Sequence, residues 1–139
     1  MKLFLKLIAT SFLSALLFGV YFGILMVIEN YYEISALENL IEGFTLGSIF
    51  SFPVYLTIGI LFSYLSNWIT NKVNPNKPYV LGLLMYSLLG LSVGVALLYR
   101  SVGFLNFLDI LYFLGIGVLA TNIFYHVLFL LNGLTKHKK

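Results

Sequence analysis

The one histidine or charged residue that lies well inside an apolar stretch of this sequence is His126, about 10 Å from the end of the stretch near Gly133. Asn122 precedes it by four residues, so both side chains fall on one face of a helix. Such a pair could form a proton relay or contact a ligand. It could also hold neighbouring helices together through hydrogen bonds. Tyr125 and Thr121 are close enough in sequence to join either network.

A second group of reactive side chains is acidic. Four of the five acidic residues lie within residues 28–43: Glu29, Glu33, Glu38 and Glu42. Carboxylates can bind Ca²⁺ or a cationic substrate, but this spacing does not bring all four onto one helix face, and the glycine of a calcium loop is missing. A solvated, outward-facing loop therefore explains the segment better than a cation-binding or partner-binding surface.

Other catalytic chemistry is not indicated by the sequence. The chain has no cysteine, which excludes disulfides, thiolate catalysis and cysteine-based metal sites. It contains no HExxH motif, no serine-triad signature and no phosphate-binding glycine loop. No apolar stretch contains a carboxylate at depth, unlike the spans of proton-coupled exporters. We therefore expect no catalytic residue, no cofactor and no metal site, and we predict that the protein is not an enzyme.

The composition indicates that lipid covers most of this chain. Charged residues make up 9% of it, against about a quarter in soluble domains, and its mean hydropathy is +0.99. Four stretches lack Asp, Glu, Lys and Arg, and each exceeds the roughly 20 residues that a helix needs to cross a bilayer: Leu7–Ile28, Gly43–Asn71, Pro78–Tyr99 and Ile110–Thr135. Continuous apolar stretches favour helices over barrel strands, and the first is too long for a secretory signal.

The fold prediction is thus an all-α bundle of four transmembrane helices. We expect a single domain over residues 1–139, with spans at approximately 7–28, 43–70, 78–99 and 107–133 and an outer loop at 29–42. Seven lysines would lie on one side of the membrane and Arg100 on the other: Lys2, Lys6, Lys72, Lys77, Lys136, Lys138 and Lys139. The positive-inside rule then places both termini in the cytoplasm. Few, dispersed lysines argue against nucleic-acid binding; the lysine-rich tail fits contact with anionic lipid.

Local signals predict where two helices begin. Ser35 and Glu38 match a capping box, and apolar residues after it share one face: Ile34, Leu37, Ile41 and Phe44. A short amphipathic helix here would lie on the outer surface or lead straight into the second span. Asn106 and Asp109 form a similar capping pair before the fourth span, although Asp109 could also pair with Arg100.

Small residues at every fourth position predict close helix packing, because they let backbones approach one another. The first and third spans carry the clearest series: Ser11, Ala15, Gly19 and Gly23, then Gly90 and Gly94. Such a seam could lie within the fold or join copies in an oligomer. Pro53 interrupts the second span and predicts a kink there, either a static bend or a gate.

The block "FPVYLTIGILFSYLSNWIT" (Phe52–Thr70), followed by "KPYVLGLLMYSLLG" (Lys77–Gly90), resembles small four-span membrane proteins of Gram-positive bacteria. The matching features are a glycine-then-serine second span with a polar end: Gly59, Ser63, Ser66 and Asn67. The resemblance covers about the middle third of the chain. It implies a bacterial plasma membrane and assigns no activity.

The sequence therefore favours a non-enzymatic membrane protein that acts by helix packing, with its partners being the lipid bilayer and either a membrane protein or a second copy. An accessory, regulatory or immunity-type role fits this description. The alternative is a minimal oligomeric transporter or channel with a path near His126 and Asn122. A holin-like pore is a third option.

Overall fold

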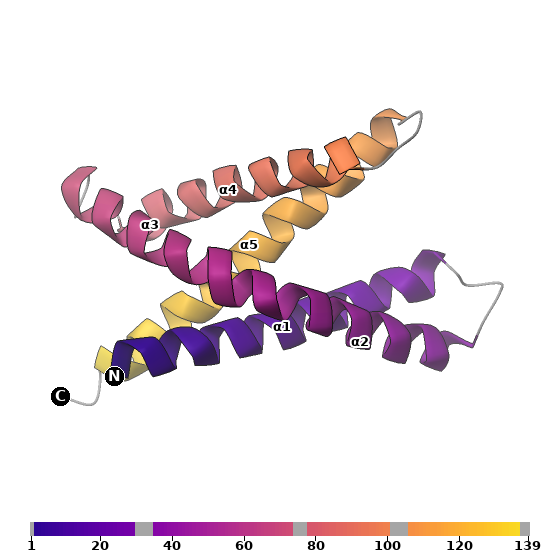
Figure 1. Ribbon diagram of the computed structural model, residues 1–139, viewed down its shortest axis with the longest axis horizontal. Coiled ribbons are helices and arrows are strands. Elements are labelled where there is room, and N and C mark those ends of the chain that lie inside the picture. Colours follow the sequence, from indigo (N-terminus) through magenta and orange to yellow (C-terminus); the bar gives the residue numbers. More distant parts are fainter. Residues whose placement is uncertain (1, 30–34, 74–77, 101–105, 137–139) are drawn as a thin grey trace. The chain divides into compact units, whose positions relative to one another are not determined.

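The computed structural model describes residues 2–29, 35–73, 78–100 and 106–136, and these residues are almost entirely helical. The elements are α1 (Lys2–Glu29), α2 (Ala36–Val54), the π-helical turn η1 (Tyr55–Gly59), α3 (Ile60–Val73), α4 (Pro78–Arg100) and α5 (Phe107–Lys136) (Figure 1). The turn η1 joins α2 directly to α3. The prediction of an all-α fold is confirmed.

Four stretches of the described helices are long and apolar enough to cross a membrane: Phe4–Glu29, Ala36–Thr70, Pro78–Tyr99 and Phe107–Gly133. The prediction of four such helices is therefore confirmed. The second stretch has 35 residues and rises about 52 Å as a helix, well beyond a hydrocarbon core of about 30 Å. It is longer than a straight crossing requires.

The chain forms two compact units. One consists of Met1–Leu61 with Val127–Lys139, and the other of Phe62–His126, so the division falls inside α3 and inside α5. The prediction of a single domain over residues 1–139 stays a prediction.

The helix predicted after the capping box is present and continues without a break into the predicted span at 43–70. Helix α2 starts at Ala36, and the Ser35 side chain caps it by accepting a hydrogen bond from the Glu38 backbone N–H at 3.2 Å. Residues 36–42 therefore form the first turns of a helix that leads straight into the second predicted span, one of the two arrangements expected from the sequence, while residues 30–34 lie outside the described residues. The capping box sets this start because it satisfies backbone donors that a helix otherwise leaves without a partner.

Glycines define the packed face of α2, and Phe44 of the predicted apolar face also lies against Gly19 of α1. Leu37 and Ile41 are 66% and 57% exposed, whereas Gly43 and Gly47 are buried. Close approach of backbones, and not the size of apolar side chains, thus selects the packed face. This choice is expected in lipid, where exposing a leucine carries no penalty.

Glycines on both helices form the α1–α2 seam. A Cβ atom on Gly23 would lie 2.7 Å from the Leu40 carbonyl oxygen, and one on Gly43 would lie 2.6 Å from the Gly23 Cα. These separations are too short for any side chain, so the helices cross in contact because glycine stands at these positions. The small residues Ser11 and Ala15 are also buried.

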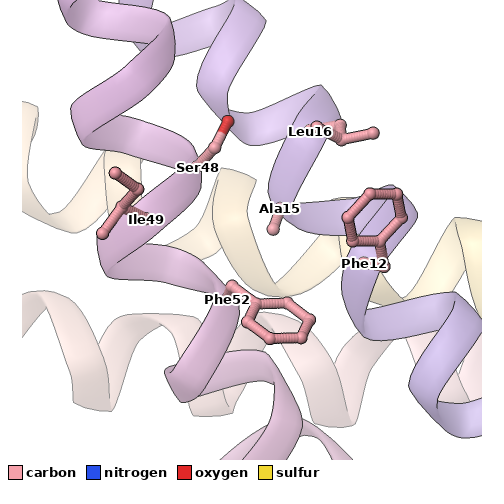
Figure 2. A pocket seen from close by; sticks show the side chains of 6 residues that line it. All are labelled: Phe12, Ala15, Leu16, Ser48, Ile49 and Phe52. Carbon is pink, nitrogen blue, oxygen red and sulfur yellow. The ribbon is translucent and has the colours of Figure 1, made fainter.

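Beside this seam, α1 and α2 enclose an apolar groove of about 360 Å³. Figure 2 shows its six lining side chains, three from each helix: Phe12, Ala15, Leu16, Ser48, Ile49 and Phe52. The rings of Phe12 and Phe52 meet edge to face, with centroids 6.2 Å apart. The groove therefore has an aromatic wall contributed by both helices.

The helix is irregular immediately after Pro53. Proline lacks the backbone N–H of a helical residue, and the π-helical turn Tyr55–Gly59 follows it directly. The Thr57 hydroxyl donates to the Pro53 carbonyl at 2.7 Å. The structure thus places a change of helical pitch beside Pro53, and a kink at this position stays a prediction.

Candidate functional site

The candidate site lies in the unit Phe62–His126, where α4 and α5 pack as an antiparallel pair. Glycines fix their separation: a Cβ on Gly90 would lie 2.5 Å from the Val118 Cα, and one on Gly94 would lie 2.8 Å from the Leu114 Cα. Gly117 in turn lies against Gly90. The contacts shift by four residues along each helix, so they define one register for the whole hairpin.

Four residues nearer the start of α4, the same face carries Tyr86 in place of a glycine. Tyr86 and Phe124 are each 1% exposed. The Tyr86 ring stacks on Tyr125 at 5.0 Å and on Phe124 at 6.1 Å, and Phe62 of α3 meets it edge to face at 5.0 Å. Aromatic packing thus continues the seam that the glycines begin.

Hydrogen bonds cross from α5 to α4 at this level. The Thr121 hydroxyl donates to the Tyr86 carbonyl at 2.7 Å, and the Asn122 side-chain amide donates to the Ser87 hydroxyl at 3.1 Å. The Tyr125 hydroxyl donates to the Tyr79 carbonyl at 2.9 Å. Three residues of α5 therefore hold α4 through polar contacts, in a setting where hydrogen bonds contribute to helix association.

Both ring nitrogens of His126 are occupied within this hairpin. Its Nδ1 lies 2.8 Å from the Asn122 backbone carbonyl oxygen, and its Nε2 lies 3.1 Å from the Tyr79 hydroxyl. Because a carbonyl oxygen can only accept, Nδ1 carries the proton and donates it to Asn122. In the singly protonated ring Nε2 is then an acceptor, and the Tyr79 hydroxyl donates to it.

The contact with Tyr79 places His126 near one end of the hairpin. Tyr79 is the second residue of α4, so His126 lies beside the first turn of that helix. The depth of about 10 Å expected from the sequence is a distance along α5, counted from Gly133, and not a distance along α4. Relative to α4, His126 is close to the end of the span.

The two predicted site residues, His126 and Asn122, lie together but do not form a side-chain pair. His126 binds the backbone of Asn122, while the Asn122 side chain turns to Ser87. Thr121 and Tyr125 do join hydrogen bonds to α4, as their positions suggested. Within the described residues, no group of three or more His, Cys, Asp and Glu side chains could hold a metal ion.

Sequence reasoning missed the α4 side of the site. Tyr86, Ser87 and the Tyr79 contact with His126 were not singled out. The available signal was the four-residue spacing that joins Gly82 and Tyr86 to Gly90 and Gly94, which marks a single packed face. Gly82 lies directly against the Tyr125 ring.

At the far end of the hairpin the capping pair is present. The Asn106 backbone N–H donates to the Asp109 carboxylate at 2.9 Å. This bond stabilises the start of α5 and places a negative charge where the helix dipole favours it. The alternative pairing of Asp109 with Arg100 involves a side chain outside the described part of the structure.

Comparison of the chain with protein-family models, with curated proteins and with solved structures gave no match.

Proposed function

We propose that this is a non-enzymatic, multi-pass protein of a bacterial plasma membrane that acts by packing its helices against a partner membrane protein or a second copy. Accessory, regulatory and immunity-type roles all use this mode of action. The distribution of lysines supports an orientation with both termini in the cytoplasm.

The main support for the proposal is that both ring nitrogens of His126 have hydrogen-bond partners within the hairpin. Its two nitrogens bind the Asn122 carbonyl and the Tyr79 hydroxyl, so the residue best able to move a proton in the spans contributes to the hairpin itself. Thr121 and Tyr125 use their hydroxyls in the same way. This use of polar groups favours a packing role over a conducting one.

Gly115 supports α5 as the helix that meets a partner. Glycines 90, 94 and 117 have atoms of a neighbouring helix where a Cβ would stand, whereas nothing lies within 4 Å of a Cβ on Gly115. This glycine is exposed in the first third of the α5 stretch Phe107–Gly133, where another helix could approach closely.

Native mass spectrometry of the protein extracted from its own membrane in a mild detergent tests the proposal. We expect a stoichiometric foreign protein or a second copy to remain bound, and Gly115→Leu to remove it. Ser92→Leu, a similar small-to-large change at an exposed site on α4, should leave it bound. A monomer that retains no protein in the unaltered chain would overturn the proposal.

A transporter or channel is the second candidate, because the His126 side chain is exposed on the surface of the hairpin. In that case an oligomer would place His126 and Asn122 beside a path. Flux into proteoliposomes that disappears in His126→Ala, with protein yield unchanged, would support transport. Unchanged flux in His126→Ala would show that no transport path depends on this residue.

A further inference from the structure

We propose that the lysine-bearing end of the unit Phe62–His126 binds the headgroup of an anionic phospholipid, with Lys72 supplying the positive charge and Trp68 the interfacial anchor. The inference goes beyond the proposed function, since its partner is a lipid and not a protein. It requires only that the helices cross a membrane.

The first observation is a contact between two exposed side chains at the end of α3. The Lys72 Nζ lies 4.1 Å from the centroid of the Trp68 ring, one helical turn away. Trp68 is 58% exposed, and Lys72 is exposed as well. The ring orients the ammonium group through a cation–π interaction and leaves its other side open to a ligand.

The second observation is which side of α3 is packed. Ser63, Ser66 and Thr70 are buried and recur at helical spacing. Trp68 and Lys72 lie on the remaining surface, so they point away from the packed side of the helix. A ligand can therefore reach them without any rearrangement of the unit.

The third observation is the charge distribution. Between residues 62 and 126 the sequence contains a single acidic residue, Asp109, whose carboxylate accepts the Asn106 N–H at the start of α5. Helix α4 has 23 residues and separates the two ends of the unit by about 34 Å. A negative group that binds Lys72 would therefore come from outside this unit.

The fourth observation places these residues at a membrane interface. Trp68 lies six residues after Phe62, and Tyr79 lies seven residues before Tyr86, while the rings of Phe62 and Tyr86 are in contact. Because α3 and α4 are joined by only four residues, Trp68 and Tyr79 lie at a similar level, roughly 10 Å from that contact. Tryptophan, tyrosine and lysine at one level are typical of the headgroup region.

A lipid phosphate is the negative group available at that level. An anionic lipid such as phosphatidylglycerol offers Lys72 a net charge, which zwitterionic phosphatidylcholine does not. Trp68 suits the same boundary because its ring packs on the upper acyl chains while its indole N–H faces polar groups.

The test is native mass spectrometry of the full chain in mild detergent, with equal amounts of phosphatidylglycerol and phosphatidylcholine added. We expect preferential retention of phosphatidylglycerol, which Lys72→Gln lowers roughly fivefold. Lys72→Arg should keep it, and Trp68→Leu should weaken retention of both lipids. Lys6→Gln is the matched control, because it removes the same charge from a different helix and should preserve the preference.

Three results would overturn the inference. One is equal retention of the two lipids by the unaltered chain. Another is an equal loss of phosphatidylglycerol retention in Lys6→Gln and Lys72→Gln, which would show that the total charge of the protein, and not a site at Lys72, retains the lipid. The last is displacement of phosphatidylglycerol by excess inorganic phosphate, which would indicate a general anion site.

Discussion

The α1–α2 and α4–α5 seams each bring two long apolar helices together, but by different means. In the first, glycines face one another on both helices, and nearby hydroxyls such as those of Thr10 and Ser11 donate to carbonyls of their own helix. In the second, glycines occupy one end, while stacked rings and hydrogen bonds from α5 to α4 occupy the other. The contacts described for the first seam are close approaches of glycines, and those described for the second combine such approaches with hydrogen bonds between the helices.

This difference shows what the polar residues contribute. A glycine contact permits close approach without a directional bond, whereas a bond such as Thr121 to the Tyr86 carbonyl adds a directional contact in the register that the glycines define. His126 and Asn122 add further bonds at the same end of the hairpin. Polar side chains on α5 therefore reinforce the register of α4 against α5 that the glycine contacts define.

The largest effect is expected where glycine meets backbone. We expect Gly90→Leu to lower the free energy of unfolding by about 3 kcal/mol or more, because the new Cβ would meet the Val118 Cα at 2.5 Å. Unfolding of the purified protein from a mild detergent by added denaturing detergent measures this loss. Gly115→Leu, which enters open space, should stay within about 0.5 kcal/mol of the original. Similar losses at both sites would contradict the register described for α4 and α5.

A smaller substitution probes the α1–α2 seam. Gly23→Ala adds a single carbon 2.7 Å from the Leu40 carbonyl oxygen, and the backbone there must move to admit it. We expect a loss of about 2 kcal/mol in the same unfolding assay. No measurable loss of unfolding free energy would show that the two backbones move apart at little cost, and that their close approach does not determine how α1 and α2 pack.

The polar contribution can be isolated with a matched pair of threonines. Thr121→Val removes the hydrogen bond to α4, and we expect a loss of about 1 kcal/mol. Thr45→Val removes only a bond to the Ile41 carbonyl of its own helix, so its effect should be close to zero. Equal effects would mean that the bond between helices contributes nothing specific.

The smallest effect concerns the His126 and Tyr79 contact. A double-mutant cycle with Tyr79→Phe and His126→Phe should give a coupling energy of about 0.6 kcal/mol, the usual size for polar contacts between membrane helices. Additive effects of the two substitutions would show that the contact does not stabilise the hairpin.

Much of the fold follows from composition, and little of the site does. Continuous apolar stretches predict helices, because in lipid a backbone can form hydrogen bonds only with itself. The Ser35 capping box can be recognised from the types and spacing of Ser35 and Glu38 alone. The capping box also predicts the start of α2 at Ala36, while the sequence alone leaves open whether that helix lies along the surface or continues into the second span. The contact of His126 with Tyr79 could not be predicted, since it depends on the register of α4 against α5, and spacing within one helix does not encode that register.

The hydrogen bonds of His126 are tested most directly by finding which of its two ring nitrogens carries the proton. Nitrogen-15 NMR of the ring in the full-length protein in lipid bilayers distinguishes its two nitrogens. We predict a protonated Nδ1 and an accepting Nε2, with the Nε2 signal shifting in Tyr79→Phe as its donor is lost. A proton on Nε2, or a ring signal that is unchanged in Tyr79→Phe, would contradict these two hydrogen bonds. Either result would favour the transporter or channel over the packing role.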